Sequence, residues 1–145
     1  MAIRQITPQE AHQLVGRGDT YIDVRTESEF AAGHPAGAIN IPVVSPDPVT
    51  RQMTINPDFL PVVQAHVARE AQVVVGCQSG MRSQRAAELL TQAGYTNVAN
   101  MQGGFGGMRD QTGRTVVAGW QESGLPVCRD CSPGNSYAGL HQKVA

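Results

Sequence analysis

The sequence predicts an α/β fold in which a central parallel sheet of about five strands carries helices on both faces. Short apolar segments that suit strands alternate with segments of helical periodicity. Val73, Val74 and Val75 form a continuous β-branched run, which is typical of a strand covered on both faces. In such sheets ligands bind beyond the carboxyl ends of the strands.

The first part of the chain predicts two strands and two helices. Residues 3–6 suit a strand. Residues 7–10, Thr-Pro-Gln-Glu, form a capping box with proline at the first helical position, so we expect a helix to about Val15. Residues 21–24 suit the second strand, and residues 27–32 suit one or two helical turns.

The alternation continues through the middle of the chain. Residues 38–41 suit a short strand, residues 45–48 a loop and residues 58–69 a helix. A helical pattern starts after Ser83, and residues 98–101 suit the last strand. The sequence therefore places a short loop between the buried valine strand and a helix.

That loop opens with Cys77 and contains Gly80 and Arg82. Free N–H groups at a helix N-terminus favour negative charge, so they stabilise a thiolate and bind an anion. Gly80 lets the backbone curl without a Cβ clash, and the guanidinium of Arg82, with that of Arg85, suits an oxyanion. We therefore predict a reactive Cys77 rather than a structural one.

Three motifs in the same order resemble those of one enzyme family. Residues 77–83, Cys-x-x-Gly-x-Arg-Ser, resemble the active-site loop of single-domain rhodaneses, the thiosulfate sulfurtransferases. Residues 21–42 are similar to the family's Asp-Val-Arg, acidic residue, Gly-His-x-x-Gly-Ala and Asn-x-Pro signature. Residues 101–105, Trp120 and residues 124–126 resemble its closing Gly-Gly, Trp and Gly-Leu-Pro. The resemblance covers roughly residues 3–127, so we expect a rhodanese domain over residues 1–127 and a tail over residues 128–145.

The resemblance implies a three-layer rhodanese-like fold and a sulfurtransferase in which Cys77 accepts sulfane sulfur from thiosulfate as a persulfide. A thiol or cyanide then removes that sulfur, and a protein acceptor is an open alternative. It also implies that the rest of the loop binds substrate, with Arg82 on the sulfonate, and that no cofactor or metal takes part. The implied substrate-binding residues are Gln78, Ser79, Gly80, Met81, Arg82 and Ser83.

Two other functions remain open at this point. Phosphatases that resemble the same fold have one more residue between cysteine and arginine than the four that separate Cys77 from Arg82, so a phosphatase or arsenate reductase is disfavoured. A persulfide carrier that does not turn over is the other alternative, because carrier and enzyme use the same persulfide.

Several polar residues favour structural roles. Asp23 and Arg25 at a strand end suggest a hydrogen-bond or ion-pair partnership, and His34 suggests a turn residue that satisfies backbone groups. The other histidines have no metal-ligand spacing. Residues 106–119 are longer than in the shortest family members and predict a polar turn or short hairpin, whose Arg109 and Arg114 could frame a pocket mouth.

The tail contains Cys128 and Cys131 in a Cys-x-x-Cys arrangement. Such a pair can be half of a four-cysteine zinc site, but the sequence has no second pair of cysteines, since Cys77 belongs to the loop. The pair can also form a disulfide, resolve a persulfide or present exposed thiols. Beyond Ser132 the tail is expected to be poorly ordered or to pack on a partner chain.

Composition agrees with a cytoplasmic protein of one domain. The chain has 145 residues, 41% of them hydrophobic, and a net charge of −1, so nothing favours nucleic acid or membranes as partners. No apolar run approaches the ~18 residues of a membrane span, and residues 1–5 lack the apolar stretch of a signal peptide. Three cysteines, an odd number, also argue against a secreted disulfide framework.

Overall fold

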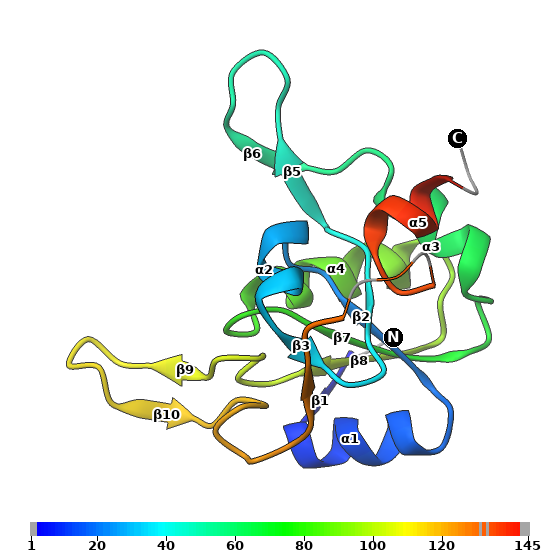
Figure 1. Ribbon diagram of the computed structural model, residues 1–145. Helices are drawn as coiled ribbons and strands as arrows, with labels where there is room; N and C mark the ends of the chain where they lie inside the picture. The colour runs from blue at the N-terminus through cyan, green and yellow to red at the C-terminus, as the bar shows by residue number, and fades with distance from the viewer. Residues whose placement is uncertain (1–2, 131, 133, 143–145) are drawn as a thin grey trace.

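The computed structural model describes residues 3–130, 132 and 134–142, and its centre is a parallel sheet of five strands (Figure 1). The strand order is β1-β8-β7-β2-β4, so β7, which leads to Cys77, lies in the middle. The predicted sheet is confirmed. The strand bounds are β1 Arg4–Ile6, β2 Thr20–Asp23, β4 Ile39–Asn40, β7 Gln72–Gly76 and β8 Asn97–Met101.

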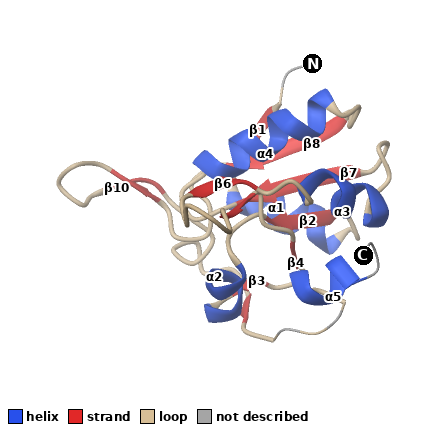
Figure 2. Ribbon diagram, turned by 90° about the horizontal axis from the view of Figure 1, so that it is seen from above, coloured by secondary structure: helices blue, strands red, loops and turns tan. Residues whose placement is uncertain are grey.

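Helices cover both faces of the sheet, which confirms the predicted fold class (Figures 1 and 2). Their bounds are α1 Pro8–Gly16, α2 Glu27–Ala32, α3 Phe59–His66, α4 Met81–Gln92 and α5 Tyr137–Gln142. The valines of β7 alternate between the layers: Val73 and Val75 pack in the core beneath α3 and α4, whereas Val74 packs on the α1 side. Within the described residues, no helix combines the length and the apolar character needed to cross a membrane.

Capping boxes begin α1 and α2. Thr7 Oγ1 accepts the Glu10 N–H at 3.1 Å, and Glu10 Oε1 accepts the Thr7 N–H at 2.9 Å. Thr26 and Glu29 repeat this exchange at 3.3 and 3.1 Å. The predicted box at Thr7 is confirmed, and the structure adds the one at Thr26. The second box fixes the Glu29 carboxylate at the start of α2.

α4 begins at Met81, so the prediction that the helix starts after Ser83 is wrong. The reason is Gly80, whose φ of +108° is in the left-handed region and turns the chain directly from the loop into the helix. Arg82 and Ser83 therefore belong to the first helical turn, and only residues 77–80 form the loop.

α3 is shorter than the predicted helix at 58–69, because it ends at His66. Val67 is extended, with φ −132° and ψ 124°, and its side chain is buried. The Val67 carbonyl accepts the Tyr95 hydroxyl, 2.6 Å away. The helix ends here because burying the Val67 side chain and forming this hydrogen bond stabilise the chain more than a further helical turn would.

Residues 45–48, predicted as a loop, are instead part of a hairpin in which β5 Val44–Pro46 pairs antiparallel with β6 Met53–Ile55. Asp47 Oδ1 accepts the N–H groups of Val49 and Thr50 at 2.8 and 3.0 Å and so fixes the turn. The hairpin projects from the body above α2 (Figure 1).

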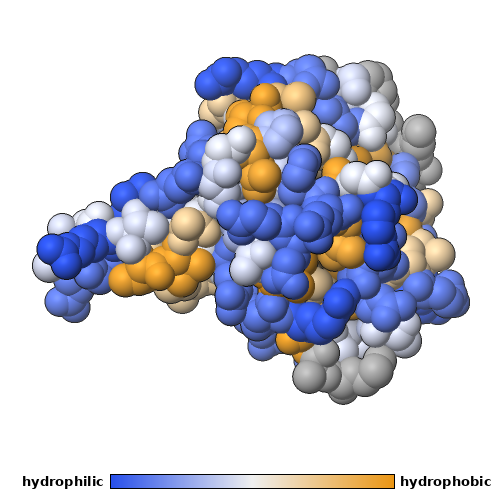
Figure 3. All heavy atoms as spheres, turned by 90° about the horizontal axis from the view of Figure 1, so that it is seen from below, coloured by the Kyte–Doolittle hydropathy of each residue, from blue (hydrophilic) through white to orange (hydrophobic). Residues whose placement is uncertain are grey.

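The segment 106–119 is a second hairpin, which confirms one of the two predicted forms. β9 Met108–Arg109 pairs antiparallel with β10 Thr115–Val117. Asp110 Oδ1 accepts N–H groups from Thr112 and Arg114 and closes the turn. Figure 3 shows this hairpin as an arm that leaves the body, with a polar tip and apolar atoms nearer its base.

The described part of the tail packs on its own domain, which differs from the expectation of poor order or a partner chain. β11 Val127–Cys128 pairs antiparallel with β3 His34–Pro35. α5 lies against α3: the Leu140 carbonyl is 2.9 Å from His66 Nε2, and the Tyr137 hydroxyl accepts Asn56 Nδ2 at 3.0 Å. The tail therefore adds to the core.

We predict that Leu140→Ala destabilises the protein by about 2–4 kcal/mol, because a nearly fully buried leucine leaves a cavity between α5 and the core. The measurement is the free energy of unfolding from urea titration. The matched control is Val49→Ala at a side chain that is 87% exposed, where we expect a change within about 0.5 kcal/mol. Equal stabilities for the two variants would mean that α5 does not stabilise the fold.

Candidate active site

Cys77 lies directly after β7, at the carboxyl end of the sheet, and its side chain belongs to the core. Its residue is only 1% exposed. The chain segment after β8 is hydrogen-bonded to the backbone of this loop. Phe105 N–H donates to the Cys77 carbonyl at 2.7 Å, and Gly106 N–H donates to the Gln78 carbonyl at 2.9 Å. The thiol is therefore fixed at the bottom of a loop.

One hydrogen-bond donor, the Gly80 N–H, and one hydroxyl oxygen, Ser83 Oγ, lie next to the sulfur. Gly80 N–H donates to Cys77 Sγ at 3.1 Å, and Ser83 Oγ lies 3.4 Å from the same atom. Ser83 is fully buried and is also hydrogen-bonded to Asn100 Oδ1 of β8. Because the Gly80 N–H stands at the N-terminus of α4, the arrangement suits a sulfur atom that carries negative charge.

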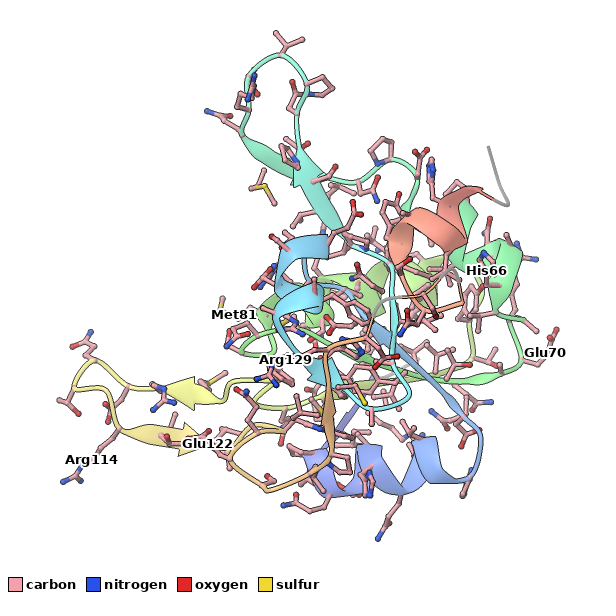
Figure 4. The ribbon with its side chains drawn as sticks, in the orientation of Figure 1. His66, Glu70, Met81, Arg114, Glu122 and Arg129 are labelled. Carbon is pink, nitrogen blue, oxygen red and sulfur yellow. The ribbon has the colours of Figure 1, made fainter. Side chains whose placement is uncertain are left out.

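The other predicted loop residues lie around the sulfur rather than on it. Gln78 Oε1 accepts Arg25 Nη1 at 3.4 Å. Met81 points outward and is 74% exposed, as Figure 4 shows at the edge of the body. Ser79 lines a surface cavity beside the loop. The structure therefore brings Gly80 and Ser83 to the thiol and leaves these three at its rim.

Arg82 forms an ion pair with Glu29 of α2. Its Nη1 and Nη2 atoms donate to the two carboxylate oxygens at 2.7 and 2.9 Å. These hydrogen bonds lower the pKa of Glu29 from 4.5 to about 2, and the same contact raises the pKa of Arg82. The positive charge expected to meet a substrate anion is thus balanced by a carboxylate.

Glu29 is one of two residues of the site that the sequence did not assign to it, although Glu29 is the acidic residue of the signature in residues 21–42. Its signal in the sequence was the capping-box spacing from Thr26, which fixes its position at the start of α2. Asn100 was missed as well, and no local pattern marks it, because only the pairing of β7 with β8 brings it beside Ser83.

Asp23 and Arg25 form a buried ion pair, which confirms the predicted structural role. Arg25 Nη2 donates to Asp23 Oδ2 at 2.7 Å and to the Gly33 carbonyl at 2.7 Å. The guanidinium also stacks over Phe105, with Cζ 4.4 Å from the ring centroid. The pair therefore joins β2, α2 and the segment behind Cys77.

His34 is buried and satisfies the backbone, as predicted, since its Nδ1 lies 2.8 Å from the Phe30 carbonyl oxygen. Arg109 pairs with Glu122 at 3.6 Å, and Figure 4 shows Arg114 at the outer end of the hairpin, away from Met81. The two arginines therefore do not frame a mouth at the cysteine loop.

Cys128 is half-buried in β11, opposite His34. Cys131, the other half of the Cys-x-x-Cys arrangement, lies outside the described residues. The role of this pair therefore stays a prediction.

Comparison with known proteins gives related sequences over most of the chain. Thiosulfate sulfurtransferase 16, chloroplastic, of Arabidopsis thaliana is 40% identical over 117 residues, which is 81% of this chain and 86% of that protein. The senescence-associated protein DIN1 of Raphanus sativus is 37% identical over 117 residues, 81% of this chain and 56% of its own length. Protein HIGH ARSENIC CONTENT 1, mitochondrial, of Arabidopsis thaliana is 40% identical over 95 residues, 66% of this chain and 55% of its own length.

The fold and a family profile agree with these relatives. The crystal structure of Rv0390 from M. tuberculosis superposes with a TM-score of 0.72 at 29% identity, covering 90% of this chain and all of that one. The profile of the rhodanese-like domain matches residues 7–111, which include β2, the cysteine loop and the closing glycines. This chain therefore belongs to the rhodanese-like domain family, in which its relatives include thiosulfate sulfurtransferases.

Proposed function

We propose that this protein is a sulfurtransferase that moves sulfane sulfur from thiosulfate, or a similar donor, to a thiol or cyanide through a persulfide on Cys77. The observation that carries the proposal is the Cys77 sulfur at the N-terminus of α4, where Gly80 N–H donates to it at 3.1 Å. Membership of the rhodanese-like family and the named relatives support sulfur transfer in general.

The proposed reaction has two covalent steps. In the first, the Cys77 thiolate attacks the outer sulfur of thiosulfate, the S–S bond breaks, and its electron pair leaves with sulfite. In the second, an acceptor thiolate or cyanide attacks the outer sulfur of the persulfide and the Cys77 thiolate is regenerated. Donor and acceptor react in turn, so ping-pong kinetics are expected.

The loop residues take separate roles in this scheme. Gly80 N–H stabilises the negative charge on the Cys77 sulfur before the first step and as the thiolate leaves in the second, since a preorganised donor needs no rearrangement. Gln78, Ser79 and Met81 form the rim that meets the substrate. Arg82 binds the sulfonate group, and Glu29 competes with the sulfonate for the same guanidinium.

Arsenate or phosphate chemistry is the second candidate, and one finding favours it. A relative of 40% identity carries the name HIGH ARSENIC CONTENT 1. The four-residue spacing between Cys77 and Arg82 and the thiosulfate sulfurtransferase relative favour sulfur instead. Turnover of arsenate or of an aryl phosphate that depends on Cys77 would favour arsenate or phosphate chemistry over sulfur transfer.

A persulfide carrier remains the non-turnover alternative, and it differs from the enzyme in rate alone. Slow use of thiosulfate together with fast transfer between proteins would favour the carrier.

Three further predictions from the sequence stay predictions. They are the cytoplasmic location, the absence of nucleic-acid and membrane partners, and the domain boundary at residue 127.

We expect the wild-type protein to gain one sulfur atom when it is incubated with thiosulfate, and cyanide to remove it. Intact mass spectrometry measures this gain. Cys77→Ala should gain none, whereas Cys128→Ala, the matched control, should gain as much as the wild type. Sulfur on Cys77→Ala, or none on a wild type whose Cys77 still alkylates, would contradict the assignment.

Arg82 and Glu29 should affect thiosulfate use in opposite directions. Arg82→Ala removes the sulfonate partner and should raise the KM for thiosulfate by about tenfold or more, as expected for loss of a charged hydrogen bond. Glu29→Gln removes the competing carboxylate and should lower that KM. Steady-state kinetics with cyanide as acceptor provide both values, and an unchanged KM in Arg82→Ala would remove Arg82 from the substrate site.

The ion pair also predicts a pH dependence of stability. The pKa of Glu29 in the folded state, about 2, lies below its usual 4.5, so the stabilisation is present above about pH 4.5 and is lost as pH falls toward about 2. Both side chains are about a third exposed, so solvent screens the effect and keeps it small. Urea titrations should give a stability difference between wild type and Glu29→Gln that shrinks from about pH 6 to about pH 3. A difference independent of pH would mean that the carboxylate is not paired in solution.

A further inference from the structure

A surface cavity of about 470 Å³ lies beside the cysteine loop. Three apolar side chains form part of its wall: Met81 at the start of α4, and Met108 and Val117 from the hairpin of β9 and β10. The cavity therefore lies between the loop and the arm that Figure 3 shows leaving the body. It is far larger than a thiosulfate ion needs.

Side-chain carboxamides form another part of the wall, beside Ser79, Gly80 and Gly103. The carboxamide residues come from three parts of the chain that the fold brings together, β1, α4 and the end of β8, and they are Gln5, Gln84, Asn100 and Gln102. Part of this set is already ordered, since Gln5 Nε2 donates to Gln84 Oε1 at 2.8 Å and Asn100 Nδ2 donates to Gln5 Oε1 at 2.9 Å. A carboxamide offers both a donor and an acceptor, which is what a peptide backbone requires.

The cavity is connected to the thiol by direct contacts. Gly80 lines the cavity, and its N–H donates to Cys77 Sγ. Asn100 also lines it and is hydrogen-bonded to Ser83, which lies 3.4 Å from the same sulfur. A molecule seated in the cavity therefore touches the groups that hold the sulfur.

The lack of charge in the cavity lining argues against small, highly charged thiols as occupants. Every residue that lines the cavity is uncharged. Two arginines next to lining residues are paired with carboxylates, Arg82 with Glu29 and Arg109 with Glu122. A small thiol such as glutathione carries carboxylates and an ammonium group that would find no ionic partner among the residues that line the cavity.

The neighbouring surface is apolar. Among the described residues, seven large hydrophobic side chains are exposed, and three of them lie at the start of α4 and on this hairpin: Met81, Met108 and Val116. Their exposed fractions are 74%, 37% and 57%. Exposed apolar groups that gather beside a reactive group indicate an interaction surface, and methionine side chains adapt to varied partners.

We propose that this cavity docks an extended segment of a partner protein in which a reduced cysteine is flanked by uncharged, apolar residues, and that this cysteine is the sulfur acceptor. The inference rests on the proposed function and specifies its acceptor. The acceptor thiol loses its proton to solvent, its thiolate attacks the outer sulfur of the Cys77 persulfide, and the S–S bond to Cys77 breaks. The products are the partner's persulfide and the Cys77 thiolate, so no oxidant or reductant is required.

The test measures single-turnover sulfur transfer from the loaded, full-length protein. The acceptors are an acetylated and amidated peptide with one cysteine between leucines, the same peptide with glutamates in place of the leucines, glutathione, and cyanide as reference. Mass spectrometry first measures how much of the protein carries the added sulfur atom after incubation with thiosulfate. Where thiosulfate adds no sulfur, inorganic polysulfide is used as the donor instead. Failure to load by thiosulfate counts against the proposed function alone, because a protein loaded by polysulfide still tests the cavity.

We expect the apolar peptide to react at least about tenfold faster than glutathione or the acidic peptide at equal concentration. Met108→Glu adds a carboxylate to the cavity wall and should lower the ratio of peptide rate to cyanide rate by about tenfold. Val49→Glu, which makes the same change on the hairpin of β5 and β6, should keep the wild-type ratio. Equal rates for peptide and glutathione, or a wild-type ratio in Met108→Glu, would overturn the proposal.

Discussion

The structure of the site depends on a backbone contact between the segment after β8 and the cysteine loop. Phe105 and Gly106 donate their N–H groups to the carbonyls of Cys77 and Gln78, while Trp120 N–H donates to the Gly104 carbonyl at 2.9 Å. Gly104 has a φ of +60°, and a Cβ there would overlap the Cys77 carbonyl oxygen. Only glycine allows this approach, and the approach determines where the thiol lies.

Once the loop is held in this way, the helix behind it completes the site. Gly80 reverses the chain within one residue, so α4 begins close to the sulfur and directs a backbone N–H at it. Glu29 of α2 then forms an ion pair with Arg82 of α4. The buried ion pair of Asp23 and Arg25 contacts the cysteine loop through Gln78. Arg25 and Arg82 each pair with a carboxylate, and the group that donates to the Cys77 sulfur is the Gly80 N–H at the start of α4.

How far local sequence determines structure differs between parts of this chain. The capping box at Thr7 and the valine run of β7 are local signals, so the helix and the buried strand could be predicted from them. The start of α4 could not, because a glycine in the left-handed region can belong either to a loop or to a helix boundary. The hairpin of β5 and β6 was missed because two prolines and an aspartate resemble a simple loop, and only the pairing of Val44 with Ile55 shows otherwise.

The sequence alone determined the fold class, the order of the sheet strands and their helices along the chain, and the place of the cysteine loop, because periodicity, caps and the Cys-x-x-Gly-x-Arg-Ser motif are all encoded by neighbouring residues. Tertiary structure decided which distant residues contact the residues around Cys77. Glu29 lies 53 positions from Arg82 and Asn100 lies 17 from Ser83, and no short-range pattern reports such contacts. The packing of α5 and the cavity beside the loop also arise from segments that are distant in sequence, so they appear only when the chain is folded.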